Sequence, residues 1–388
     1  MKDTIRLFFA GDFCSKPSTT KITVSNELKD LIQSCDLKVI NFEVPLKPEV
    51  KLPLQDRERF FQHDDAPEFL KRLGFNLFSL ANNHAFDWDD VGFKKTKAAL
   101  GDASFGAGTY EEAYQPKIVE VNGIKIGFFG LSFAAYKGVF EDVTKHKSLG
   151  CAYINDLKVN HVIMDIKKRV DYLFIIPHDG IEYIDVPLPE TIARYRDFID
   201  YGADGVIATH PHCPQGWEEY KGKPIFYSLG NFLFNSKEGY DFRAKKPHWY
   251  EGLCVVMTVS DGNLSCEVVN TRNEDNVGIV IDHDEARVQH NEQICKYLFD
   301  NDAYWFYFKQ ASEKEGYNKL LRTVDRTIHP QNMKQCTKMV AQYWLRKLLG
   351  KKPLPVNDIA LDRLFRHDTN RQFVLWSLRQ HQQSSNKK

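Results

Sequence analysis

The sequence predicts a mixed α/β layered domain followed by a helical extension. Short apolar runs typical of buried strands alternate with segments of helical apolar spacing over the first part of the chain. Two pairs of apolar runs flank Asn122-Gly123 and Asp261-Gly262, dipeptides that favour tight hairpin turns. Beyond these hairpins the remaining patterns are helical. We therefore expect strands and helices in layers first, and helices alone afterwards.

Each expected element follows from its local pattern. Strands are expected at Ile5–Ala10, Leu37–Phe42, Asn76–Ala81, Lys117–Val121, Ile124–Leu131, Tyr172–Pro177, Gly205–Ala208, Pro224–Phe234 (interrupted by Gly230-Asn231), Gly252–Val259 and Leu264–Asn270. Helices are expected at Ala66–Leu73, Asp89–Leu100, Asp156–Arg169, Glu190–Tyr201, Asn291–Phe308, Ala311–Thr323, Asn332–Leu349 and Asp358–His381. The change of character predicts a catalytic-type domain over residues 1–285 and a helical extension of unknown role over residues 286–388.

Composition and charge exclude several classes of protein. Among 388 residues, 52 basic side chains balance 52 acidic ones, so the net charge gives no reason to expect nucleic-acid binding. We find no apolar run of about 18 residues, and therefore expect no membrane span. The N-terminal stretch lacks the pattern of a signal peptide, and the eight cysteines form no CxxC pairs. We expect a cytoplasmic protein with reduced thiols.

Polar side chains follow the predicted strands where each strand ends. They are Asp12, Glu43, Asn83, His84, His178, His210 and His212. Any one of them has a simple structural explanation, such as a turn cap or a satisfied histidine. Together they form a pattern, because ligands of open α/β sheets bind beyond the carboxyl ends of strands. Carboxylate, amide and imidazole donors in one crevice predict a divalent metal site, suited to Mn, Fe, Zn or Mg.

The same stretches carry a resemblance to a known family. The runs GDF, NFEVPL, SLANNHAFDW, HDGIEY and THPHCPQGWEEYKGKPIFYSLGNFLF resemble the CapA family of poly-γ-glutamate capsule synthesis proteins, over roughly residues 4–260. That family looks like a branch of the calcineurin-like metallophosphoesterases. The resemblance implies a four-layer α-β-β-α sandwich, to which the C-terminal helices are added.

The resemblance also implies roles for the residues at the strand ends. Asp12 and His212 would bind one metal ion. Asn83, His178 and His210 would bind a second, and Glu43 would bridge the two. His84 would contact the phosphate of a substrate and protonate the leaving oxygen, as a general acid does.

Two positions depart from the usual phosphoesterase pattern. Cys14 stands where those enzymes carry the histidine of an Asp-x-His motif, and Glu43 stands where they carry an aspartate. Cys14 is either a substitute thiolate ligand or a buried structural thiol. The longer side chain of Glu43 would shift a bridging oxygen.

Further residues are assigned to the surroundings of the metals. The basic and aromatic run NSKEGYDFRAKKPHW is either a lid over an anionic substrate or a solvated loop. Within this reading we predict substrate binding by Arg243 and Lys245, together with Asn231 of the SLGNFLF run. Glu182 is either an outer carboxylate that orients a ligand histidine or an ordinary surface residue.

Three functions remain open. The first is a cytoplasmic metal-dependent hydrolase of the phosphoesterase type that acts on an anionic capsule polymer or a phosphorylated precursor. The second is amide or ligase-associated chemistry on glutamyl groups. The third is a non-catalytic scaffold that binds the polymer through its metal site. The protein would either act before export of the polymer or be recruited to the membrane capsule machinery by a partner protein.

Overall fold

The computed structural model describes residues 4–52, 59–135, 138–140, 148–236, 246, 248–260, 262–275, 277–312 and 368–385, with a few positions between 341 and 349. Its backbone contacts divide the chain into two compact units, Met1–Asn301 and Asp302–Lys388. The first unit includes α7 (Glu285–Phe299), which the sequence analysis placed in the extension. The functional division at residue 285 stays a prediction.

The larger sheet of the first unit has nine strands. Its order is β2-β17-β16-β15-β1-β3-β4-β5, and β14 pairs with the carboxyl-terminal part of β1. The strands are β1 (Ile5–Ser15), β2 (Thr23–Val24), β3 (Leu37–Phe42), β4 (Leu77–Ser79), β5 (Ser104–Phe105), β14 (Asn231–Asn235), β15 (Glu251–Ser260), β16 (Asn263–Glu274) and β17 (Gly278–Ile281). Since β1, β3 and β4 are parallel neighbours, their carboxyl ends reach the same edge.

The smaller sheet has six strands in the order β12-β13-β11-β10-β8-β7. They are β7 (Lys117–Val121), β8 (Ile124–Ser132), β10 (Tyr172–His178), β11 (Gly205–Ile207), β12 (Trp217–Tyr220) and β13 (Lys223–Phe226). The turn between β7 and β8 is the predicted one, with left-handed φ values of 51° at Asn122 and 80° at Gly123. A separate two-stranded piece joins β6 (Ala107–Gly108) and β9 (Gly150–Cys151).

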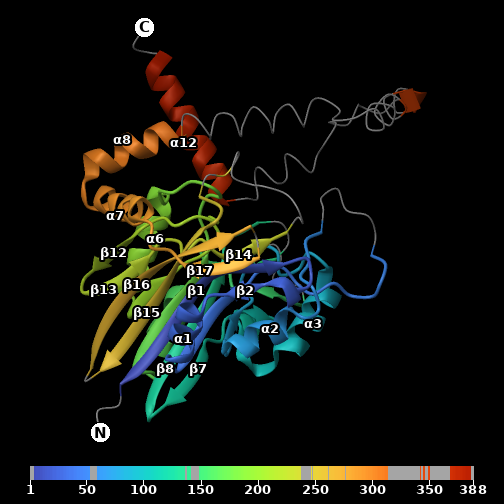
Figure 1. Cartoon of the computed structure of the whole chain (residues 1–388). Helices are drawn as coiled ribbons and strands as arrows, with labels where there is room; N and C mark the ends of the chain where they lie inside the picture. The colour runs from blue at the N-terminus through green and yellow to red at the C-terminus, as the bar shows by residue number, and fades with distance from the viewer. Residues whose placement is uncertain are drawn as a thin grey trace. The chain divides into compact units, whose positions relative to one another are not determined.

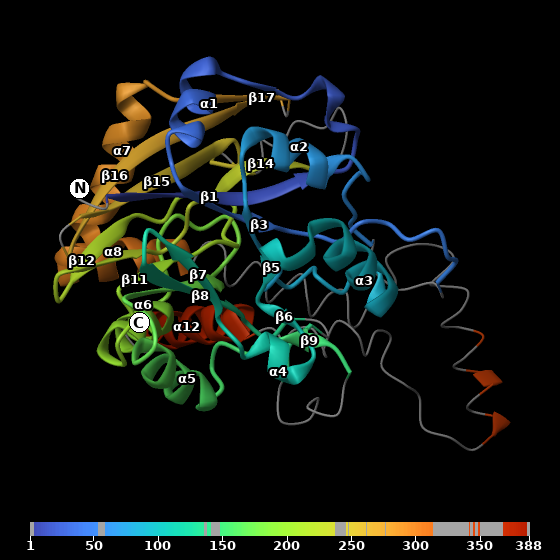
Figure 2. The ribbon, with the colours of Figure 1, turned by 90° about the horizontal axis from the view of Figure 1, so that it is seen from below.

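The two sheets face each other and helices cover their outer faces. Between the sheets, the rings of Phe9, Phe128 and Phe174 pack together in one buried cluster. Helices α1 (Asn26–Gln33), α2 (Ala66–Leu73) and α3 (Asp89–Leu100) belong to the larger sheet, and α5 (Lys158–Lys167) and α6 (Pro189–Asp200) to the smaller one. Figure 1 shows α1 in front of the strands, and Figure 2, turned by 90°, shows the strands between α1 and α2 on one side and α5 and α6 on the other. The predicted four-layer α-β-β-α sandwich is confirmed.

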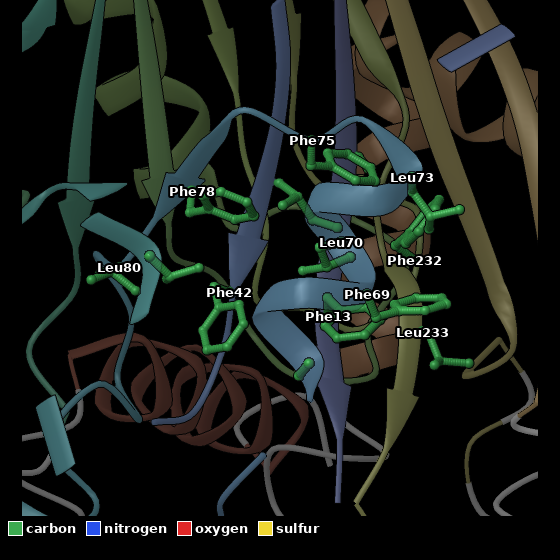
Figure 3. Packing of buried hydrophobic residues seen from close by; sticks show 14 of the residues in the cluster. Phe13, Phe42, Phe69, Leu70, Leu73, Phe75, Phe78, Leu80, Phe232 and Leu233 are labelled. Atoms are coloured by element: carbon green, nitrogen blue, oxygen red, sulfur yellow. The ribbon is translucent and has the colours of Figure 1, made fainter. Parts of the chain in front are cut away.

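Helix α2 shows how the sequence produces one of these layers. Pro67 occupies its first turn, where the missing N–H is not needed, and Gly74 ends it with a left-handed φ of 106°. Phe69 and Leu70 lie four and three residues before Leu73, so all three side chains share one face of the helix. Figure 3 shows this face packed against aromatic side chains of the sheet, including the stacked pair Phe13–Phe69.

Two predicted elements differ from the structure. The run Pro224–Phe234, expected to be interrupted by Gly230-Asn231, is divided between the two sheets: β13 ends at Phe226 in the smaller sheet, and β14 begins at Asn231 in the larger one. Gly230 lies at this crossing with a φ of 66°, which favours glycine. The expected helix Asn291–Phe308 is interrupted at Asp300, whose extended backbone separates α7 from α8 (Asn301–Ala311).

The second unit contains two described helices, α8 and α12 (Asp368–Ser385). They pack through aromatic rings: Phe308 contacts Phe373 at 6.2 Å, and Trp305 contacts Trp376 at 5.1 Å between ring centroids. The helices expected at Ala311–Thr323 and Asn332–Leu349 lie mostly outside the described residues. None of the described helices combines the length and apolar character that a membrane span requires.

A close backbone approach at β1 leads to the first prediction. The Asp12 N–H donates to the Gly230 carbonyl over 2.9 Å, and a Cβ at Gly11 would lie 2.0 Å from that oxygen. Gly11→Ala should therefore force the two backbones apart and destabilise the protein by about 1–3 kcal/mol or more. Urea unfolding measures this loss.

Gly127→Ala is the control for this variant. The added methyl there meets the movable end of the Leu173 side chain at 3.0 Å, so we expect a smaller loss. A Gly11→Ala protein as stable as Gly127→Ala would contradict the close approach at β1.

Candidate metal centre

The strands bring the predicted ligands to one buried place. Asp12 lies within β1, Glu43 follows β3, and Asn83 follows β4 in the larger sheet. His178 ends β10, and His210 and His212 follow β11 in the smaller sheet. All six side chains belong to residues that are at most 3% exposed, and His84 is 7% exposed. The centre thus draws its ligands from both sheets.

Three imidazoles converge on one carboxylate oxygen. Glu43 Oε1 lies 3.7 Å from His178 Nε2, 3.8 Å from His212 Nε2 and 4.0 Å from His84 Nε2. Both Glu43 oxygens are buried, and no described donor makes a hydrogen bond to either. A buried acceptor without a donor is rare, because the desolvation of the oxygen is then not compensated. A cation held among these atoms would compensate it.

His178 lies among three of the other predicted ligands. Its Nε2 is 2.9 Å from Asn83 Oδ1 and 3.2 Å from His210 Nδ1. Its Nδ1 is 3.0 Å from the hydroxyl of Thr209, which can accept a hydrogen bond from an Nδ1–H. Nε2 and Asn83 Oδ1 lie side by side toward the centre, where both can serve as ligands of one cation.

Asp12 is held in place by two donors. Asn41 Nδ2 donates to Oδ1 over 2.7 Å, and the His210 backbone N–H donates to Oδ2 over 3.1 Å. His212 Nδ1 lies 3.5 Å from Oδ2 and His178 Nδ1 lies 3.7 Å from Oδ1. Asp12 thus lies near a predicted ligand of each of the two ions, His212 for the first and His178 for the second.

Two overlapping sets of donors lie within ligating distance of one another. One is Asp12, Glu43 and His178, and the other is Glu43, His210 and His212. Glu43 belongs to both sets, as a bridging residue would. The histidines are divided differently from the predicted assignment, in which Asp12 shared an ion with His212. The assignment of ligands to ions stays a prediction.

Asn231 lies behind His212 rather than in an open space. It is fully buried, and its Oδ1 accepts a hydrogen bond from His212 Nδ1 over 2.9 Å. Its Nδ2 donates to the Trp249 carbonyl over 2.8 Å. This arrangement places the remaining lone pair of His212 on Nε2, toward Glu43. It favours an orienting role, and substrate binding by Asn231 stays a prediction.

Strained backbone is concentrated at this centre. His210 and His212 have φ values of 106° and 57°, and Val44 and Tyr183, next to Glu43 and Glu182, have 67° and 68°. Such values are uncommon outside glycine, and a β-branched residue such as valine is an outlier there. Residues of this kind cluster at functional sites, where the surrounding structure holds them in place.

Burial shifts the pKa values of the ligands toward their neutral forms. It raises the pKa of Asp12 to about 6, and burial together with the Asp12 charge raises the pKa of Glu43 well above its usual range. It lowers the pKa of His178 well below normal, and that of His212 to about 4. Neutral imidazole is the ligating form, and a cation favours the ionised carboxylates. The donor set therefore fits divalent metal.

His84 is oriented by an aspartate that the sequence analysis missed. Its Nδ1 donates to Asp87 Oδ2 over 2.9 Å, and Asp87 is fully buried. The opposite nitrogen, Nε2, is the one that faces Glu43 at 4.0 Å. The spacing His84-x-x-Asp87 within one turn is a signal in the sequence, since residues three apart meet in a helical turn.

Asn41 and Thr209 are the other contributors that the sequence analysis missed. Asn41 contacts Asp12 and lies 3.2 Å from His178 Nδ1, and Thr209 holds the same nitrogen. Asn41 is two residues before Glu43, so alternation along a strand indicates the same face. Thr209 directly precedes the histidine pair.

Cys14 lies in apolar surroundings. It packs with Val44, Phe234, Trp249 and Tyr250 in a buried cluster. Burial, and after it the Glu43 charge, raises the pKa of the thiol well above normal, so the thiolate form is disfavoured. This placement favours the structural thiol over the substitute ligand.

One lysine lies beside the centre in an aromatic setting. Lys246 Nζ is 3.8 Å from the Tyr183 ring centroid and 4.0 Å from that of Trp249, and the Trp249 ring lies 5.0 Å from that of His212. Burial lowers the pKa of Lys246 to about 8, against the effect of Glu182. The charge of Glu182 also acts on His212 and Glu43, while its predicted orienting role stays a prediction. Arg243 and Lys245 lie outside the described residues.

Distant likenesses to solved structures accompany this geometry. A protein titled a novel phosphatase from Mycoplasma pneumoniae is 16% identical, with 71% of this chain and 96% of that chain covered and a TM-score of 0.44. A putative 5'-nucleotidase from Staphylococcus aureus is 16% identical, with 75% and 58% covered and a TM-score of 0.45.

Curated relatives are more similar in sequence. The capsule biosynthesis protein CapA of Bacillus anthracis is 30% identical over 55% of this chain and 54% of its own length. The PGA biosynthesis protein CapA of Bacillus subtilis is 28% identical over 60% and 64%. The chain thus spans between half and two thirds of these relatives. Residues 6–236, more than half of the chain, match the family described as "Bacterial capsule synthesis protein PGA_cap". This range includes the strand ends that carry the candidate metal ligands. The chain belongs to this bacterial capsule synthesis family.

Proposed function

We propose that this chain is a metal-dependent hydrolase of the phosphoesterase type that works in the synthesis of a capsule or poly-γ-glutamate. Its substrate would be the anionic polymer or a phosphorylated precursor. The names of the Bacillus relatives support the capsule process, and the buried donor set supports the chemistry. The cytoplasmic location and a partner in the membrane capsule machinery stay predictions.

One observation carries the proposal. Three histidine Nε2 atoms surround Glu43 Oε1, and one of them belongs to a histidine whose other nitrogen is held by a buried aspartate. In a purely structural cluster, a buried carboxylate would accept hydrogen bonds, whereas neither oxygen of Glu43 accepts one from a described donor. The combination of a ligand set with one oriented imidazole is that of a hydrolytic centre.

The ligands and their chemistry follow from the donor set. Asp12, Asn83, His178, His210 and His212 would hold divalent ions, with Glu43 between them. When bound, such ions polarise a phosphoryl oxygen and acidify a water molecule. Asn41, Thr209 and Asn231 keep the ligand side chains in their orientations through hydrogen bonds.

His84 would donate a proton to the leaving group. The Asp87 carboxylate fixes the ring so that Nδ1 donates away from the centre and Nε2 faces into it. A proton on Nε2 can then be transferred to the leaving oxygen as its bond to phosphorus breaks. Lys246, beside the same centre, supplies a cation for an anionic substrate.

A panel of phosphoesters tests the proposal. We expect the protein loaded with Mn²⁺ or Zn²⁺ to hydrolyse at least one phosphomonoester or phosphodiester, and chelator-treated protein to lose that activity. His178→Ala should lose it as well. Release of inorganic phosphate or nitrophenol measures turnover.

The same assay separates the rival functions. Tight binding of poly-γ-glutamate without turnover of any phosphoester would instead support the polymer-binding scaffold, for which Lys246 in its aromatic setting is the supporting feature. Metal-dependent cleavage of γ-glutamyl amides would support the glutamyl chemistry.

A further inference from the structure

A second group of metal-ligating side chains lies outside the centre described above. Asp185 comes from the loop after β10, His248 from the segment before β15, and His290 from α7. All three belong to the first unit of the chain. One ligand atom from each lies within 4.8 Å of the other two. None of the three is among the proposed ligands of the main centre.

The two histidines face the same carboxylate oxygen. Asp185 Oδ2 lies 3.2 Å from His290 Nε2 and 3.9 Å from His248 Nε2. The two rings are parallel within 3°, with centroids 4.7 Å apart. Ligands bound tetrahedrally to one zinc ion at about 2.0–2.2 Å lie roughly 3.3 Å from one another. The observed separations are close to this spacing.

Glu251 prepares His248 for ligation. The Nδ1–H of His248 donates to Glu251 Oε2 over 2.9 Å, so the lone pair is on Nε2, the nitrogen nearer to Asp185. A carboxylate behind a ligating histidine is the usual arrangement in metal sites, because it fixes the ring and its tautomer.

A simple ion pair accounts less well for His290. Its Nε2 is buried and makes no hydrogen bond among the described residues, although Asp185 Oδ2 is only 3.2 Å away. The two atoms are therefore close without the alignment of a hydrogen bond. Two metal-ligating atoms that both point toward an ion position between them produce this geometry.

We propose that Asp185, His248 and His290 bind one divalent transition metal ion, separate from the main centre. Two imidazoles and one carboxylate favour a borderline ion such as Zn²⁺. The ion would fasten α7 to the segment that carries Lys246 and Trp249, and Trp249 packs against His212. The ion would therefore stabilise the side of the main centre that Trp249 forms. The proposal does not depend on whether that centre hydrolyses phosphoesters.

Zinc stoichiometry of the full chain tests the site. The protein is stripped with chelator, loaded with excess Zn²⁺, desalted and measured by elemental analysis. We expect His290→Ala to bind about one equivalent less than the wild type, and to do so again in a His178→Ala background. His283→Ala is the matched control, since His283 is an exposed histidine near the start of α7, and it should bind as much as the wild type.

Equal zinc content in His290→Ala and the wild type would overturn the proposal. A direct measurement on the wild type removes any dependence on the folding of variants. In zinc-loaded crystals, anomalous diffraction at the zinc edge should give a peak about 2.0–2.2 Å from both Nε2 atoms and a carboxylate oxygen of Asp185. The lack of a peak there would likewise refute the site.

Discussion

Glu43→Gln should lose most of the metal from the main centre, at both positions together. Two divalent ions about 4 Å apart repel strongly: at an effective dielectric constant of 20, a unit-charge pair contributes about 4 kcal/mol and a pair of divalent ions about 16 kcal/mol. The ionised carboxylate of Glu43, which belongs to both donor sets, offsets part of that repulsion. A neutral amide of the same shape does not.

Metal counting by elemental analysis checks this result. The variants are made in the His290→Ala background, so that the Asp185, His248 and His290 group does not contribute to the count. Glu43→Asp keeps the charge but shortens its reach, and should give partial occupancy. Cys14→Ser should keep the full count, since the thiol lies in an apolar cluster. Full two-metal occupancy in Glu43→Gln would exclude the bridging role.

The elements around this centre were predicted well where the local pattern alone decides them. The structure has β3 at Leu37–Phe42, α2 at Ala66–Leu73 and α3 at Asp89–Leu100, with the predicted bounds. Each is an uninterrupted run with a clear apolar pattern and an acidic or glycine residue at its end. The position of functional groups after strands was therefore visible in the sequence.

Other features depend on contacts between distant segments. The short strand β2 has no pattern of its own and forms because it pairs with β17, which in turn pairs with β16. The crossing at Gly230 is set by the backbone of Gly11, far away in sequence. Helix α1 was missed although Ser25 caps it and Leu28 and Ile32 are buried. That helix has the spacing of an amphipathic segment.

The residues of the site divide in the same way, into those that a local pattern predicts and those that depend on contacts between distant segments. Side chains that follow strands were found because the carboxyl ends of parallel strands lead to the same crevice. The spacing His84-x-x-Asp87 is a signal in the sequence, but the hydrogen bonds of Asp87 with His84 and of Thr209 with His178 are established by the structure. Asp185, His248 and His290 come from three segments with no shared pattern, so their proximity had to come from the structure.

His84→Ala should reduce turnover of an alkyl phosphoester by about 10²–10⁴-fold in kcat, the usual contribution of a general acid. The metal content should stay at the wild-type level, because His84 belongs to neither of the two donor sets that contain Glu43. His178→Ala should instead lose metal. Asp87→Asn leaves the imidazole in place but removes the carboxylate that orients it, so its kcat should lie between those of His84→Ala and the wild type.

The leaving group makes this test specific to proton donation. A nitrophenolate departs without a proton, whereas an alkoxide needs one, so the defect of His84→Ala should be much smaller with nitrophenyl esters than with alkyl esters. His63→Ala, at a half-exposed histidine paired with Asp65, is the control and should behave as the wild type with both. A defect of equal size for the two substrates would remove His84 from the role of general acid. Equal loss of metal from His84→Ala and His178→Ala would make His84 a metal ligand instead.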